Sequence, residues 1–195
     1  MNVLTHFLAG WALSLPPDLE RRDRALIVFA SVAPDLDAVV LVGDLARGRA
    51  LDDCVLFATY HHVLGHNILF AALTVFGCVL LARRKALVGG LSLLAIHLHF
   101  LCDIVGSRGP DGSQWAIPYL LPFSKAWNPA VGWQWALNAW PNIVFTIALL
   151  ALALYAAWTR GCSPVGLFSE RADRALVSTL RHRFGNPHQR LVTRS

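Results

Sequence analysis

Long apolar stretches alternate with short polar breaks along most of the chain. Three stretches approach the roughly 20 residues that a helix needs to cross a hydrocarbon core, at 65–82, 86–105 and 140–158. Only the basic residues 83–85 separate the first two, so we expect an antiparallel helical hairpin with a very short turn. The pattern predicts an all-α integral membrane protein.

Two further apolar stretches are less regular. Residues 25–43 are long enough to cross, but they include Pro34, Asp35 and Asp37, and acidic residues at membrane depth are costly and point to function. Residues 4–15 reach only about half to two-thirds of a normal span, so they are expected to tilt, re-enter or pack inside the bundle. The prediction is therefore a membrane bundle of four to five helices.

The polar breaks predict two loops and a tail. One loop covers about 44–60. The other covers 106–138 and is rich in Gly, Pro and Trp, which favours irregular structure lying on the membrane surface. These breaks divide the chain into a membrane-embedded helical domain, residues 1–158, and a basic cytosolic tail, residues 159–195.

Composition agrees with a membrane protein. Hydrophobic residues make up 55% of the chain and charged residues 15%, against about 25% charged in soluble domains. The net charge of +5 does not predict a nucleic-acid partner, because the basic residues lie at the ends of apolar stretches and in the tail. The expected partner is the lipid bilayer. The four Cys form no C-x-x-C pair, which argues against a thiolate metal site.

Basic residues also predict the orientation. Those within 21–24, 83–85 and 160–183 fall on one side if the stretches 25–43, 65–82, 86–105 and 140–158 all cross. The positive-inside rule makes that side the cytoplasm. We therefore expect a multi-pass protein with a cytoplasmic tail and an outward-facing 106–138 loop.

His and Asp residues are concentrated in and beside the apolar stretches. Under this topology, six of them converge from four segments near the outer membrane face: His6, Asp35, His61, His66, His99 and Asp103. Imidazole and carboxylate together suit a divalent metal, most of all Zn²⁺, with Mn²⁺ or Fe²⁺ as alternatives. The first domain is thus predicted to bind metal toward the outer face.

Spacing refines this prediction. His99 and Asp103 are four residues apart, so they share one face of a helix and can reach one ion. His61 and His66 are five apart, so one of them would ligate from the turn that begins a helix.

The two acidic residues near Pro34 have different expected roles. Asp35 and Asp37 cannot both face one ion from a regular helix, although Pro34 can relax that constraint. Asp35 is the predicted ligand, and Asp37 is the predicted general base that accepts a proton beside the metal. Asp37, His62 and His97 could equally orient the ligands.

The chemistry-bearing residues occur in a familiar order. The motifs are Thr5-His6 with Gly10, Pro34-Asp35-Leu36-Asp37, the run from His61 to Asn67, the run from His99 to Asp103, Gly109, and the run from Pro118 to Ser124. Over about residues 5–124 the chain resembles the bacterial membrane-bound metal-dependent hydrolases, also described as LexA-binding, inner membrane-associated hydrolases. The resemblance implies a bacterial inner membrane location and hydrolase activity.

The chain departs from that family's pattern at some polar positions. His62, Gly65 and Asn67 stand where the family has Arg, Thr and Ser, and Ala38 stands where His is frequent. The metal ligands match, so the departures concern catalysis more than metal binding. The His-x-x-x-Asp pair also resembles, by analogy, the zinc sites of phospholipase C and P1-type nucleases.

Three functions follow as hypotheses. The first is a membrane-embedded zinc hydrolase acting on a phosphoester or lipid-linked substrate at the membrane surface. The alternative is a non-catalytic metal-binding membrane protein, structural or regulatory, with an unidentified protein partner. An ion transporter is less favoured, because the charged residues gather toward one face and do not line a full crossing.

Overall fold

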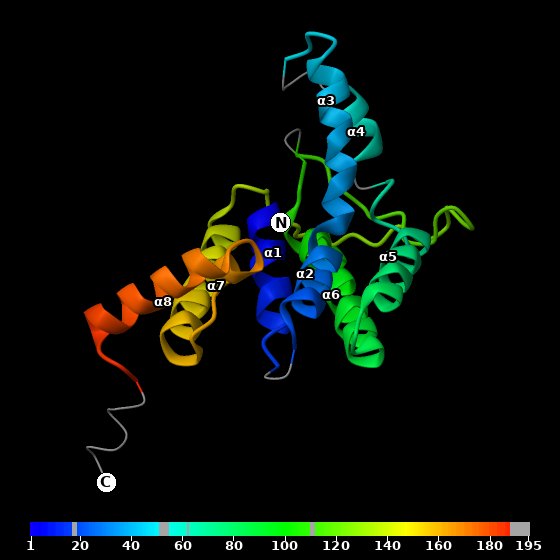
Figure 1. Ribbon diagram of the computed structural model, residues 1–195. Helices are drawn as coiled ribbons and strands as arrows, with labels where there is room; N and C mark the ends of the chain where they lie inside the picture. The colour runs from blue at the N-terminus through cyan, green and yellow to red at the C-terminus, as the bar shows by residue number, and fades with distance from the viewer. Residues whose placement is uncertain (17–18, 51–54, 62, 110–111, 188–195) are drawn as a thin grey trace.

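The computed structural model is all-helical and describes residues 1–16, 19–50, 55–61, 63–109 and 112–187. Its elements are α1 (Val3–Leu13), α2 (Arg21–Val32), η1 (Ala33–Val39), α3 (Val40–Leu45), α4 (Val55–Tyr60), α5 (Ile68–Leu81), α6 (Lys85–Gly106), α7 (Trp140–Arg160), η3 (Pro164–Leu167) and α8 (Glu170–Phe184). Within the described ranges the only bridge of β type is isolated, between Arg108 and Ala136. The predicted helical membrane bundle is confirmed (Figure 1).

Three helical segments are long and apolar enough to cross a membrane. They are Arg21–Leu45, which runs through α2, η1 and α3, together with α6 and α7. The predicted stretches 25–43, 86–105 and 140–158 fall on these segments. The 3₁₀ winding of η1 begins at Ala33, just before Pro34, so the expected distortion is present in the first of them.

Two apolar helices are shorter than a full span. The sequence pattern predicts a helix over 65–82, but α5 has 14 residues and begins only at Ile68, which makes it about 21 Å long. It begins there because the Asn67 side chain accepts the backbone N–H of Phe70 and caps the helix. Helix α1, with 11 residues, is shorter still.

The predicted loop 44–60 is partly helical, which corrects the sequence reading. Helix α3 continues to Leu45, α4 occupies Val55–Tyr60, and the two lie side by side in a hairpin that projects from the bundle (Figure 1). The two helices contact each other, while Val42, Leu45 and Val55 stay exposed. Short apolar runs of this kind do not distinguish helix from loop in sequence.

Helix α1 packs between α2 and α7, and α2 packs in turn on α6 (Figure 1). The α1–α2 contact is close, because a Cβ atom added to Gly10 would lie 2.0 Å from the Ser31 hydroxyl oxygen. By contrast, Leu73 and Phe76 on α5 and Ile147 on α7 are exposed. This distribution fits a bundle whose outer surface faces lipid.

A buried carboxylate ties the start of α2 to the start of α6. Asp23 is fully buried, and its two oxygens accept the backbone N–H groups of Arg83 and Arg84 at 3.0 Å each. These N–H groups belong to the short turn that joins α5 and α6. Asp23 therefore holds α2 to the α5–α6 turn at the end of the bundle where the basic residues lie.

Asp23→Ala is expected to destabilise the protein strongly. Two backbone N–H groups would lose a charged acceptor, at a total cost of about 3 kcal/mol. The thermal midpoint of the detergent-purified protein, followed by tryptophan fluorescence, should fall by roughly 6–12 °C. Glu20→Ala is the matched control, since its exposed ion pair with Arg83 should contribute less than about 1 kcal/mol. Equal midpoints for the two variants would contradict this role of Asp23.

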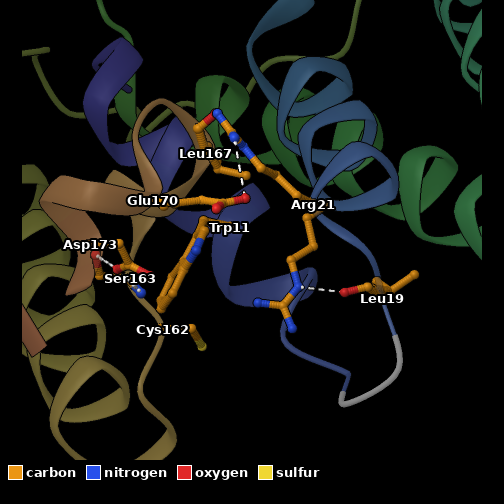
Figure 2. A pocket seen from close by; sticks show the side chains of 10 residues that line it. Trp11, Leu19, Arg21, Cys162, Ser163, Leu167, Glu170 and Asp173 are labelled. Carbon is orange, nitrogen blue, oxygen red and sulfur yellow. Dashed lines mark hydrogen bonds and ion pairs between the residues drawn. The ribbon is translucent and has the colours of Figure 1, made fainter.

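The segment after α7 folds back onto the bundle. Arg21 of α2 donates to the Leu167 carbonyl and pairs with Glu170, while Asp173 accepts from the Ser163 hydroxyl (Figure 2). A pocket of about 290 Å³ lies between these groups and Trp11. None of the predicted metal ligands lines it. The division into 1–158 and 159–195 stays a prediction.

Candidate metal centre

Four of the predicted ligands meet at one place in the bundle. Helix α1 supplies His6, η1 supplies Asp35, and α6 supplies His99 and Asp103. Each offers one donor atom, and the four atoms lie within 4.8 Å of one another. Neighbouring donors in a tetrahedral Zn²⁺ site lie about 3.4 Å apart. The cluster is somewhat wider than that, so its side chains would draw together around one ion.

Helix α6 fixes the two central members of the cluster. His99 Nε2 lies 3.1 Å from Asp103 Oδ2, one turn further along the helix. The Nδ1–H group of His99 donates to the Ser31 carbonyl at 2.8 Å, which leaves Nε2 as the nitrogen with a lone pair facing the cluster. In metal sites, a backbone carbonyl that accepts the second ring N–H of a ligating imidazole orients the ring in the same manner.

Helix α1 adds His6 from the opposite side. Its ring stacks on that of His99 with centroids 3.7 Å apart, and its Nε2 lies 3.1 Å from Asp103 Oδ1. Both rings are buried. Helix α1 thus brings His6 to the cluster even though it is shorter than a full membrane span.

Asp35 reaches the cluster from the distorted part of the first long helix. Its Oδ1 lies 3.6 Å from His99 Nε2. Its Oδ2 is buried and has no hydrogen-bond partner in the part of the chain that the structure describes. A buried carboxylate oxygen without a donor is costly, and a bound cation would remove that cost.

Asp37 faces a different set of groups. Its Oδ1 accepts from His61 Nδ1 at 2.6 Å, and its Oδ2 accepts from His66 Nδ1 and from the Gly65 backbone N–H at 3.1 Å each. One carboxylate therefore holds two imidazole rings and the turn before α5. Its predicted role as general base is not tested by these contacts and stays a prediction.

His66 lies directly beside the four-residue cluster. Its Nε2 is 3.1 Å from His99 Nε2 and 3.3 Å from Asp103 Oδ2. Burial lowers the pKa of His66, but hydrogen bonds to Asp103 and Asp37 outweigh burial and raise it to about 9. A metal ion bound at this position would compete with the proton on this ring.

The remaining sequence candidates lie further out. His61 lines a cavity of about 800 Å³ next to Asp35, and its ring meets the edge of Trp115 at 5.5 Å. The His97 ring contacts the Leu93 carbonyl and the Tyr119 hydroxyl. His62 lies outside the described residues.

Sequence reasoning missed two neighbours of Asp103. The Ser107 hydroxyl donates to Asp103 Oδ1 at 2.8 Å, and the Met1 ammonium contacts both Asp103 Oδ1 and Ser107 Oγ. Ser107 follows Asp103 by four residues, so the helical spacing that paired His99 with Asp103 also points to it. The Met1 contact has no comparable signal in the sequence.

Two departures from the hydrolase pattern have structural explanations. A Cβ atom at Gly65 would lie 2.1 Å from the Pro34 carbonyl oxygen, so the close contact between η1 and this turn excludes a larger residue. Asn67 caps α5 and also donates to the Val63 and Leu64 carbonyls. Both residues thus shape the turn that presents His66.

Comparison with known proteins gives one result. A family model described as YdjM inner membrane protein matches residues 1–171, so the chain belongs to this family. No curated protein and no solved structure gives a significant match. The expected bacterial inner membrane protein is thereby confirmed. The family description names a location and no reaction. It gives no support to the likeness to phospholipase C and P1-type nucleases.

Proposed function

We propose that this inner membrane protein is a metal-dependent hydrolase whose cluster of His6, Asp35, His99 and Asp103 holds Zn²⁺. The observation that carries the proposal is the convergence of these four donors, of which Asp35 has a buried Oδ2 without a hydrogen-bond partner among the described residues. Zn²⁺ in a site of this kind lowers the pKa of water to about 7 and polarises an ester.

Charge supports a divalent ion at this position. Asp35 and Asp103 bring two carboxylates to one site between membrane helices. The Met1 ammonium contacts Asp103, whereas Asp35 Oδ2 has no hydrogen-bond partner among the described residues, and an unpaired charge at this depth is expensive. Imidazole and carboxylate donors without thiolate favour Zn²⁺, with Mn²⁺ and Fe²⁺ as alternatives. His66 is a further ligand in this proposal, since its Nε2 lies within 3.3 Å of both His99 and Asp103.

The neighbouring cavity supports access to a substrate. Asp35 and His61 both line it, so one side of the cluster adjoins open space. His61 would exchange a proton with the substrate there, held in one tautomer by Asp37 behind it. In this arrangement Asp37 acts through His61 and His66, and need not itself accept the proton. The substrate would be a phosphoester or lipid-linked compound.

The orientation belongs to the same proposal. The start of α2, the α5–α6 turn and the end of α7 lie at one end of the bundle, and the N-terminus lies toward the other end (Figure 1). Arg22, Arg84 and Arg160 mark the first end, which supports a cytoplasmic position for it. The metal centre would then face the periplasmic side, with the basic tail in the cytoplasm.

A second candidate function rests on a specific observation. Four protein donors around one ion is the number found in closed, structural zinc sites, whereas catalytic sites keep a position open. Gly65 and Asn67, which replace polar residues of the hydrolase pattern, serve packing and capping. Both features favour a metal that fastens α1, η1 and α6 together without catalysis.

Metal-dependent turnover tests the first proposal against the second. Detergent-purified protein is expected to carry at least one equivalent of zinc by elemental analysis and to hydrolyse bis(p-nitrophenyl) phosphate. Removing zinc with a chelator should abolish hydrolysis, and adding zinc should restore it. Bound zinc without turnover on phosphomonoesters or phosphodiesters would favour the structural role. Protein that takes up neither zinc nor manganese would exclude both proposals.

A further inference from the structure

The cavity beside the metal centre has one polar end and apolar walls. Its volume is about 800 Å³, within the range of pockets that bury a small ligand. Asp35 and His61 lie at the end next to the cluster, while Ala38, Trp115 and Leu137 supply apolar wall. A ligand that matches this lining has a polar group and an apolar chain.

Arg108 supplies a cationic group to the same cavity. One of its terminal nitrogens donates to the Gly132 carbonyl at 3.0 Å. Its Nε atom is buried and has no hydrogen-bond partner within the described residues. A guanidinium carries several N–H donors in a planar fork that matches phosphate oxygens. The Nε atom is enclosed by protein, so it is the guanidinium at the cavity wall, through its remaining terminal N–H donors, that can meet an anionic group.

Two apolar residues of the cavity lining are solvent-accessible. Val3 and Leu137 line it and are 54% and 47% exposed. Trp140 and Ile143, at the start of α7, are exposed as well. Exposed apolar side chains at the cavity suit a ligand with an acyl chain better than a wholly water-soluble one.

We propose that this cavity binds a lipid with a phosphate head group, held by Arg108, with its acyl chain lying between Trp115 and Leu137. The inference deepens the proposed hydrolase function and depends on it for any reaction, but not for binding. A water-soluble phosphoester would use Arg108 in the same way and would leave the apolar wall without a partner.

Photocrosslinking in nanodiscs tests the proposal. The probe is phosphatidic acid carrying a diazirine on its acyl chain, and labelled peptides are identified by mass spectrometry. Wild-type protein should be labelled in the peptides that contain Trp115 and Leu137. Arg108→Gln should reduce that labelling about tenfold, the effect of losing one charged hydrogen bond. Arg108→Lys should retain part of it, and Arg171→Gln, at an exposed residue of α8, should retain all of it.

Two further arms make the outcome decisive. A diazirine diacylglycerol, which lacks phosphate, should label wild type and Arg108→Gln equally, and glycerol phosphate should not displace the phosphatidic acid probe. Equal phosphatidic acid labelling of wild type and Arg108→Gln, or full displacement by glycerol phosphate, would overturn the proposal. Labelling is also measured after chelation. Arg108-dependent labelling of protein that binds no metal would leave the lipid site standing while the hydrolase proposal fails.

Discussion

Replacing Asp103 with alanine is expected to remove the bound metal altogether. The Asp103 oxygens lie within 3.3 Å of ring nitrogens in His6, His66 and His99, and the residue is buried. The loss of zinc affinity should exceed the roughly 10–100-fold weakening that follows from removing a residue that only hydrogen-bonds to a metal ligand. Elemental analysis of purified protein should show zinc at background level.

Controls separate loss of metal from loss of fold. His99→Ala removes a second central donor and should give the same result as Asp103→Ala. His182→Ala is the matched control, because His182 is exposed on α8 and, among the residues that the structure describes, belongs to no cluster of metal donors. Asp103→Asn keeps the size of the side chain and should still lose metal. If well-folded Asp103→Ala and Asp103→Asn proteins retained wild-type zinc, the proposed metal centre would be wrong.

Asp37→Asn is expected to weaken metal binding by about 10–100-fold without abolishing it. Asp37 holds His61, His66 and the Gly65 backbone through both its oxygens. An amide offers one acceptor oxygen, so one ring would lose its orienting partner and His66 would present Nε2 less well. Competition with a fluorescent zinc chelator measures the affinity, and His97→Ala, which alters an imidazole with other partners, is the control.

The same variant decides between two roles for Asp37. The sequence predicts a general base, whereas the contacts favour a residue that positions His61 and His66. Unchanged zinc affinity with strongly reduced turnover of bis(p-nitrophenyl) phosphate would support the general base. Reduced affinity with turnover recovered at saturating zinc would support positioning.

Features that depend on local pattern were predictable. A long apolar run has few alternatives to a membrane helix, and this reasoning located α6 and α7. Helical periodicity placed His99 and Asp103 on one face, and they do lie together. The expectation that Pro34 disturbs its helix also agrees with the 3₁₀ segment at Ala33–Val39.

Features that depend on contacts between distant segments were not predictable. Nothing near Asp37 in sequence indicates that both its oxygens are used by a turn that follows α4. The α3–α4 hairpin consists of two short helices that contact each other. Neither helix is long enough to be identified from its own sequence. Asn67 and Gly65 looked like altered catalytic neighbours until their capping and packing contacts were seen.

The order of the ligands along the chain has a consequence for biogenesis. Synthesis proceeds from the N-terminus, so α1 and η1, with His6 and Asp35, leave the ribosome before α6 exists. Until α6 is inserted, Asp35 has neither His99 nor a shared cation beside it, and a lone carboxylate opposes stable membrane insertion. If the proposed cation binds here, stable insertion of the first long helix and completion of the metal centre would both depend on the arrival of α6.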